Sequence, residues 1–279
     1  MSFITIDQEK CDLDGICVKE CPMNIIEMTG EKSPPTPTKE AEEKCILCGH
    51  CVAVCPYGAL THSRLPIEDF PPINKELTFS VEQAEQFLRS RRSVRIYKEK
   101  AVEPDRIERL IEIARHAPTG SNSQLVDWLV IDTRPEVVKV TGMVMDMMRQ
   151  MIERNHPLAM KYGLAGFVSA WEQGADPITR GAPVLVLAHA PKEYGQAQVD
   201  CTAALTFLDL AAPALGLGTC WAGFVLVALS QYQPLVDALG LPEGHGVFGA
   251  MMVGYPRFRY HKLVPRNKPE ITWKSRMNA

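Results

Sequence analysis

The feature that most constrains this chain is a duplicated run of cysteines near its beginning. Residues 11–22 read CDLDGICVKECP and residues 45–56 read CILCGHCVAVCP, and at an offset of 34 seven of the twelve aligned positions are identical. Seven of the nine Cys lie in the range 11–55. An odd count crowded into one segment, behind a start that does not read as a secretion signal, disfavours a disulfide framework. The pattern instead predicts metal-binding thiolates in a reducing compartment.

The spacing of these cysteines favours iron–sulfur clusters over zinc. The second copy reads C-x2-C-x2-C-x3-C-P, the arrangement of bacterial ferredoxins, in which three close thiolates bind one cluster and the fourth reaches the other. Structural zinc sites usually combine two separated C-x2-C pairs. The sequence therefore predicts two clusters, one held by Cys45, Cys48, Cys51 and Cys21, and the other by Cys11, Asp14, Cys17 and Cys55.

Asp14 is the departure from this pattern, because it stands where the second copy has Cys48. A carboxylate is a hard ligand, whereas iron in such clusters is normally held by soft thiolates. Three interpretations stay open: Asp14 binds the fourth iron of a [4Fe-4S] cluster, the cluster is [3Fe-4S], or solvent binds the fourth iron with Asp14 nearby.

Composition excludes several other classes of protein. With 46% hydrophobic and 23% charged residues, the chain of 279 residues has the amino-acid composition of a globular protein. Its net charge of −3 gives no general attraction to nucleic acid. The apolar range 201–229 is long enough to cross a bilayer but is interrupted by Pro213 and by glycines. It predicts a buried helix followed by a buried strand, in a cytoplasmic protein that contacts no membrane.

Residues 1–62 are expected to form the iron–sulfur domain, the proline-rich range 63–79 a linker, and residues 80–279 an α+β domain. Helices are predicted from Ser80 and after Glu103, each with a typical N-terminal signal. Short apolar runs predict buried strands. The strands are expected at 128–131, 184–188, from Trp221 onward and at 247–253, and a nearly all-apolar helix is expected at 203–217.

Three segments of the longer domain carry residues suited to a ligand. The range 91–95 (RRSVR) offers three guanidinium groups and a hydroxyl, which suit a phosphate. The range 117–124 (APTGSNSQ) is rich in side-chain donors and acceptors. The range 216–223 (GLGTCWAG) has small residues that let the backbone approach a flat ligand. By contrast, the G-x-G-x-x-G match at 244–249 leads into a predicted strand rather than a helix, so it does not indicate a dinucleotide site.

Together with Gly254-Tyr255-Pro256, these segments resemble, in their order along residues 86–279, the nitroreductase family of FMN flavoproteins. The resemblance implies a homodimer with a mixed central sheet surrounded by helices. It implies FMN contacts from Arg91, Arg92, Ser93, Arg95, Cys220, Trp221, Arg266 and Lys268, and from Pro118, Thr119, Ser121 and Asn122 of the second subunit. The backbone N–H groups of Ala222 and Gly223 would face the flavin N5, where many relatives have a Glu in place of Ala222.

The combination predicts an FMN-dependent oxidoreductase that takes electrons from an external low-potential donor through two clusters. Its acceptor would be a small, planar, electron-poor molecule such as a nitroaromatic or a quinone. Two alternatives stay open: a non-catalytic electron-transfer or redox-sensing protein, and an enzyme whose clusters are structural while NAD(P)H reduces FMN directly.

Overall fold

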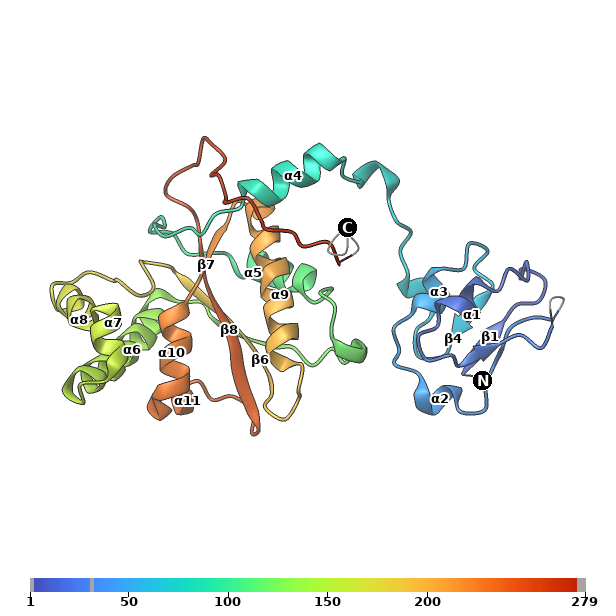
Figure 1. Ribbon diagram of the computed structural model, residues 1–279, viewed down its shortest axis with the longest axis horizontal. Helices are drawn as coiled ribbons and strands as arrows, with labels where there is room; N and C mark the ends of the chain where they lie inside the picture. Colours follow the sequence, from blue (N-terminus) through green and yellow to red (C-terminus); the bar gives the residue numbers. More distant parts are fainter. Residues whose placement is uncertain (1–2, 31–32, 275–279) are drawn as a thin grey trace. The chain divides into compact units, whose positions relative to one another are not determined.

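The computed structural model describes residues 3–30 and 33–274. It divides the chain into two compact units (Figure 1). The first consists of Met1–Thr78 with Pro118–Gln124, and the second of Phe79–Ala117 with Leu125–Ala279.

The first unit is built from short elements around a small apolar core. Two antiparallel pairs of strands, β1 with β4 and β2 with β3, are joined by short helices. Ile4, Ile26, Val52 and Leu60 are buried in this core. The elements are β1 (Ile4–Ile6), α1 (Ile16–Glu20), β2 (Ile26–Glu27), β3 (Thr36–Pro37), α2 (Ala41–Lys44), α3 (His50–Ala53) and β4 (Leu60–His62).

The duplication seen in the sequence recurs in the backbone. Three pairs of residues separated by 34 positions adopt left-handed conformations, with φ between 50° and 71°: Leu13 and Leu47, Gly15 and Gly49, and Asn24 and Gly58. A non-glycine residue with positive φ is uncommon, and for Leu it is costly. Its recurrence at the same offset shows that both copies fold the same cysteine-bearing loop.

The second unit contains a four-stranded antiparallel sheet in the order β5-β6-β8-β7. Its strands are β5 (Asp127–Ile131), β6 (Val184–Pro191), β7 (Gly218–Trp221) and β8 (His245–Gly254). Its helices are α4 (Val81–Ser90), α5 (Pro104–Ala114), α6 (Arg134–Glu153), α7 (Pro157–Tyr162), α8 (Leu164–Glu172), α9 (Ala197–Ala211), α10 (Gly223–Gln231) and α11 (Gln233–Ala238).

Helices cover both faces of this sheet (Figure 1). Successive side chains of β6 point to opposite faces of the sheet. Val184 and Val186 pack in one hydrophobic cluster with α5 and α9. Leu185 and Leu187 pack in the other cluster with α6 and α10. Because both faces are covered, β6 reads as a continuous apolar run rather than an alternating one.

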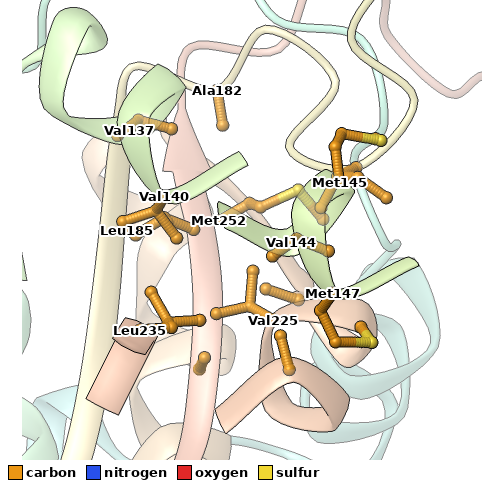
Figure 2. Packing of buried hydrophobic residues seen from close by; sticks show 14 of the residues in the cluster. Val137, Val140, Val144, Met145, Met147, Ala182, Leu185, Val225, Leu235 and Met252 are labelled. Atoms are coloured by element: carbon orange, nitrogen blue, oxygen red, sulfur yellow. The ribbon is translucent and has the colours of Figure 1, made fainter. Parts of the chain in front are cut away.

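The methionines of α6 belong to the second of these clusters (Figure 2). Met145, Met147, Met148 and Met151 are buried, which fits flexible side chains filling an irregular core. By contrast, Met160 lies in α7 and is 88% exposed.

Several predicted elements are confirmed. Helix α4 begins after Ser80, whose hydroxyl accepts from the Gln83 backbone while the Gln83 side chain accepts from the Ser80 backbone. Helix α5 begins at Pro104. The G-x-G-x-x-G segment opens β8 and no helix, as expected.

For the apolar range, the predicted helix is confirmed with shifted bounds, whereas the predicted strand was wrong. The helix expected at 203–217 begins earlier, at Ala197, and its α-helical part ends at Ala211 before a 3-10 turn at Ala212–Leu215. The strand expected from Trp221 onward ends at Trp221, and the apolar residues that follow form α10. Periodicity alone does not separate a buried strand from a buried helix in such a run.

Among the described residues, none of the helices combines the length and the apolar character needed to span a membrane.

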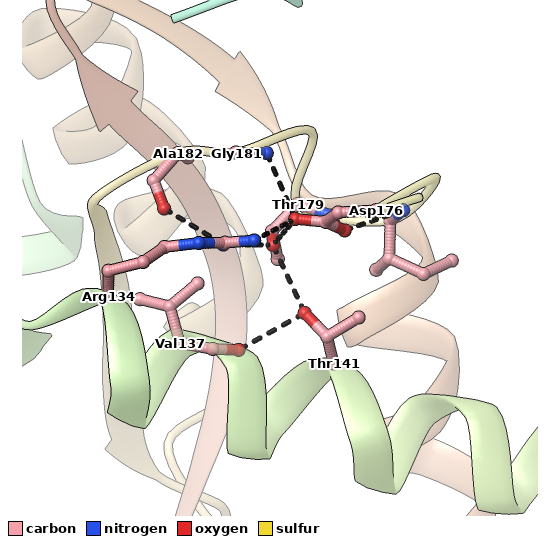
Figure 3. A network of polar contacts seen from close by, with 8 residues as sticks. Arg134, Val137, Thr141, Asp176, Thr179, Gly181 and Ala182 are labelled. Carbon is pink, nitrogen blue, oxygen red and sulfur yellow. Dashed lines mark hydrogen bonds and ion pairs between the residues drawn. The ribbon is translucent and has the colours of Figure 1, made fainter. Parts of the chain in front are cut away.

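A buried polar network anchors the loop before β6 (Figure 3). The Asp176 carboxylate accepts from Arg134 Nη2 at 2.7 Å and from the backbone of Thr179 and Gly181 at 2.8 and 2.9 Å. The Thr179 hydroxyl also lies 3.0 Å from that of Thr141 in α6. Burial opposes the charge of Asp176, but these donors outweigh burial and lower its pKa. The loop is therefore tied to α6.

We predict that Asp176→Ala destabilises the protein, because it leaves the buried backbone N–H of Thr179 without its acceptor and removes the carboxylate that pairs with Arg134. Hydrogen bonds to a charged group are worth about 1.5–3 kcal/mol, which corresponds to a fall in melting temperature on the order of 5–10 °C. Asp146→Ala is the control, since Asp146 forms an exposed ion pair with Arg149 and such pairs contribute little. Equal melting temperatures for the two variants would contradict the role given to the network.

Candidate functional site

The structure groups the cysteines of the first unit into two sets. Burial first, then the neighbouring thiols of Cys55 and Cys11 and the carboxylate of Asp14, raise the pKa of Cys17. Cys11, Asp14, Cys17 and Cys55 also line one cavity of the first unit. Residues from both copies of the repeat thus meet at one place.

The other set contains the second copy and Cys21. Burial raises the pKa of the Cys51 thiol to about 11, and the thiols of Cys21, Cys48 and Cys45 add to the effect. Cys21 is buried, whereas the other three are partly exposed. Each set therefore combines three residues of one copy with the last cysteine of the other.

The spacing of these thiols differs from that of a mononuclear site. In the described residues, the group of three or more ligating side chains whose atoms all lie within 4.8 Å of one another is Asp127, His189 and His245, and it contains no cysteine. No disulfide joins the cysteines described, all of which are free thiols. Two sets of four ligating side chains, each drawn from both copies of the repeat, suit multi-iron clusters.

His62 is a residue of this site that sequence reasoning missed. It is 3% exposed, and its Nε2 lies 3.7 Å from the Cys45 sulfur, while its Nδ1 accepts from the backbone of Arg64. Burial, and then Arg64, lower its pKa, which favours the neutral ring. With Nδ1 as acceptor, the neutral ring carries its proton on Nε2 and donates toward Cys45. The counterpart at the offset of 34 is Met28, so only the second copy has this donor.

In the second unit, a buried carboxylate ties the arginine segment to the sheet. Asp209 of α9 accepts from Arg91 Nη1 at 3.3 Å and from the hydroxyl of Thr219 in β7. The backbone N–H of Val94 also donates to the Thr219 carbonyl at 2.8 Å. Gly218 makes this approach possible, because a Cβ there would lie 2.4 Å from Val94. The segment is therefore fixed alongside β7.

Arg91 and Arg92 consequently have different electrostatic surroundings. Arg91 is paired with Asp209, whereas Arg92 Nε and Nη2 are buried with no hydrogen-bond partner among the described residues. Both arginines line a cleft of about 450 Å³, together with Lys98, Asp209, Thr219 and Tyr260. Buried donors without partners are costly unless a ligand satisfies them. The cleft is suited to an anionic ligand of moderate size.

A further cation, Arg180, lies near this segment and was not predicted. Arg95 and Arg180 both lower the pKa of the Cys220 thiol, although burial outweighs them and the net shift is upward. Arg180 is exposed and has φ 56°. It stands in the sequence between Thr179 and Gly181, whose backbone N–H groups donate to Asp176. A single Arg in a loop carries no sequence signal, which explains why it was missed.

The structure corrects one detail at the end of β7. The N–H of Ala222 donates to the Ala250 carbonyl at 2.9 Å, so it is already used within the sheet. Gly223 is the first residue of α10, where backbone N–H groups have no partner within the helix. Of the two N–H groups predicted to face a flavin, only that of Gly223 keeps this role as a prediction. Trp221 is 36% exposed beside it.

The remaining predicted contacts lie on irregular segments. Arg266 and Lys268 are exposed on the C-terminal segment. The range 118–124 belongs to the first unit, and there Asn122 Nδ2 donates to the carbonyls of Ile46 and Leu47 at 3.0 and 2.9 Å. The role of Pro118, Thr119, Ser121 and Asn122 at the cofactor of the second subunit stays a prediction.

Comparison with protein families identifies both parts of the chain. The model of the nitroreductase family matches residues 88–255, and that of a 4Fe-4S dicluster domain matches residues 9–59. Because the first match spans more than half of the chain, the chain belongs to the nitroreductase family. It is an FMN-dependent oxidoreductase with an additional iron–sulfur domain at its beginning, as the sequence predicted.

Individual relatives share this fold at low identity. A protein of Archaeoglobus fulgidus named as an NADH dehydrogenase/NAD(P)H nitroreductase is 28% identical over 179 residues, which cover 63% of this chain and 87% of the relative. A Bacteroides fragilis nitroreductase crystallised with FMN has a TM-score of 0.53 at 21% identity, covering 68% of this chain and 99% of the other. A Desulfitobacterium hafniense nitroreductase crystallised with FMN has a TM-score of 0.51 at 20% identity. The match covers 69% of this chain and 95% of the other.

The residues present fit both kinds of cofactor. The two sets of thiols supply the soft ligands that iron prefers. The unpartnered nitrogens of Arg92, in a cleft lined by further cations, fit the phosphate of FMN.

We predict that Gly49→Ala weakens cluster retention. Gly49 has φ 71°, and a Cβ would lie 3.0 Å from the ring of Phe70. Left-handed backbone costs about 1–2 kcal/mol for an L-residue, before the contact is counted. Iron and sulfide per chain, and the temperature at which cluster absorbance is lost, should both fall. Gly30→Ala is the control, since Gly30 has no positive φ and more space. Similar losses in both variants would contradict this prediction.

Proposed function

We propose that the protein uses its N-terminal unit to conduct electrons from an external low-potential donor to FMN held by the second unit, which reduces a small, planar, electron-poor acceptor. Nitroaromatics and quinones are the acceptor class. When bound, the clusters supply one-electron transfer and FMN links it to one- or two-electron chemistry. The observation that supports the proposal is the presence, in one chain, of two sets of neighbouring thiols and a cleft whose arginine nitrogens have no partner among the described residues.

In this proposal Cys45, Cys48, Cys51 and Cys21 hold a [4Fe-4S] cluster, and Cys11, Asp14, Cys17 and Cys55 hold the other. Asp14 lines the same cavity as Cys11, Cys17 and Cys55, which supports a place for its carboxylate beside the fourth iron. The His62 donor would stabilise the more negative, reduced state of the cluster bound by Cys45. The two clusters would then differ in reduction potential.

The arginine segment would hold FMN at its phosphate end. Arg92 offers two unsatisfied nitrogens, Arg91 is already oriented by Asp209, and Arg95 and Arg180 add positive charge near Cys220. At the other end, the Gly223 N–H at the start of α10 would donate toward N5. We also propose a homodimer in which the segment with Pro118, Thr119, Ser121 and Asn122 of the second subunit completes the site, as the resemblance to the family implies.

We predict that Arg92→Met lowers FMN affinity about 10- to 100-fold, the effect of losing a charged hydrogen bond worth about 1.5–3 kcal/mol. The apoprotein should keep or raise its melting temperature, because two buried nitrogens that have no hydrogen-bond partner among the described residues are removed. Fluorescence titration of apoprotein with FMN measures the first effect. Arg115→Met is the control, since Arg115 is exposed and paired with Glu112. Unchanged affinity in Arg92→Met would rule out the proposed phosphate contact.

The activity itself is tested by reducing the holoprotein with dithionite and mixing it, without oxygen, with a panel of nitroaromatics and quinones. We expect reoxidation at least about tenfold faster than that of an equal concentration of free FMN, a difference of about 1.4 kcal/mol in barrier. No acceleration would favour the alternative, a protein that only relays or senses electrons.

The route of the electrons is tested with Cys48→Ser. Turnover of a nitroaromatic with a reduced viologen dye as donor should fall, while FMN per chain stays the same. If viologen-driven turnover is unchanged in a variant that has lost iron, the clusters do not carry the electrons. Turnover with NAD(P)H as the donor, unaffected by the substitution, would then identify direct reduction of FMN.

A further inference from the structure

The second unit contains a group of ligating side chains that the proposed function does not use. Asp127 begins β5, His189 lies near the end of β6 and His245 begins β8, so three neighbouring strands contribute one residue each. The ligand atoms of all three lie within 4.8 Å of one another. None of them lines the cleft of Arg91 and Arg92.

The pairing of the strands explains why the three side chains meet. Asp127 is directly opposite His189, and cross-strand partners point to the same face of a sheet. His189 is opposite Val247, and His245 lies two residues before Val247, on the same face. A register shift between Ala188 and His189 produces this alignment, because Phe248 is an extra residue in β8. Such irregularities commonly redirect side chains.

The rings face each other through the same type of nitrogen. His189 Nδ1 lies 2.9 Å from His245 Nδ1, and His245 Nδ1 lies 3.9 Å from an Asp127 carboxylate oxygen. In a tetrahedral zinc site with bonds of 2.0–2.2 Å, ligand atoms are about 3.3 Å apart. The two distances lie on either side of this value, and all three ligand atoms lie within 4.8 Å of one another, so a small rearrangement of the side chains would form the site.

We propose that Asp127, His189 and His245 bind a divalent transition-metal ion of the zinc type. Two neutral imidazoles and one carboxylate are nitrogen and oxygen ligands that suit zinc, and their net charge of about −1 favours a dication. His189 is 5% exposed, whereas the Asp127 side chain is 62% exposed, so the ion reaches the site from the Asp127 side. Water completes the coordination from that side.

The ion would join the ends of three strands away from the flavin cleft. β7, which carries the cleft residue Thr219, pairs with β8 only from Met251 onward. Met251 is six residues beyond His245, roughly 20 Å along an extended strand. The proposed role is therefore stabilisation of this end of the sheet, independent of electron transfer and of the proposed function.

The test uses anaerobically purified holoprotein with its clusters and FMN in place. After removal of loosely bound ions, the protein is dialysed against a series of zinc chloride concentrations, and zinc and iron per chain are measured by mass spectrometry. We expect saturation near one zinc per chain with no loss of iron, and a melting temperature that rises with zinc. No saturable zinc, or zinc uptake matched by iron loss, would overturn the proposal.

Two variants assign the zinc to these residues. His245→Ala should weaken binding by more than about 100-fold, and Asp127→Asn, an isosteric change at an exposed side chain, by at least about 10-fold. The control His116→Ala, at an exposed histidine in the turn after α5, should bind like wild type. Unchanged zinc affinity in His245→Ala would mean that the two imidazoles only share a proton. If His245→Ala misfolds and loses its FMN and iron, the zinc affinity of Asp127→Asn is the decisive measurement. A zinc affinity equal to that of the wild type in Asp127→Asn would show that the carboxylate is not a ligand and would overturn the proposed site.

Discussion

The arrangement of the flavin domain depends on one buried carboxylate. Asp209 holds Arg91 of the arginine segment and Thr219 of β7 at the same time, so it fixes the segment to the edge of the sheet. That carboxylate pairs with Arg91, whereas Nε and Nη2 of the neighbouring Arg92 are buried and have no hydrogen-bond partner in the part of the chain that the structure describes. A buried charge requires a partner, and here the partner is expected to be the ligand. The different surroundings of the two adjacent arginines thus reflect the position of one buried acidic residue near the end of α9.

The first unit has only a small hydrophobic core, and its structure is based on a local backbone conformation that occurs twice. The left-handed residues recur at an offset of 34, and the last cysteine of each copy lies with the first three ligating positions of the other. The exchange makes the two copies interdependent, since neither set is complete without the other. The differences between copies are confined to a few positions. Asp14 replaces a thiol in one set, and His62 adds a donor to the other, so the same backbone supports two electronically different sites.

The two histidines show that strand pairing can bring ligating side chains together where no local sequence motif predicts a site. His189 and His245 are 56 positions apart and neither stands in a recognisable ligand spacing. They meet because β6 and β8 are neighbours in the sheet and because one extra residue shifts the register between them. The same extra residue lies in the segment that imitates a dinucleotide motif, which shows that this segment acts as a strand and not as a phosphate loop.

Local spacing was enough to predict the cysteine sets, the two kinds of domain, the capped start of α4 and most of the strands. Those features depend on residues close together in the chain or on a motif with a fixed geometry. The apolar range after Leu217 was partly misassigned, because an all-apolar run fits a buried strand and a buried helix equally well. Arg180, His62 and the group of Asp127, His189 and His245 were not predicted. Their neighbours come from distant parts of the chain, and only the packing of the elements brings them together. The N–H of Ala222 belongs with them, since its hydrogen bond to Ala250 is a property of strand pairing that residue identity does not encode.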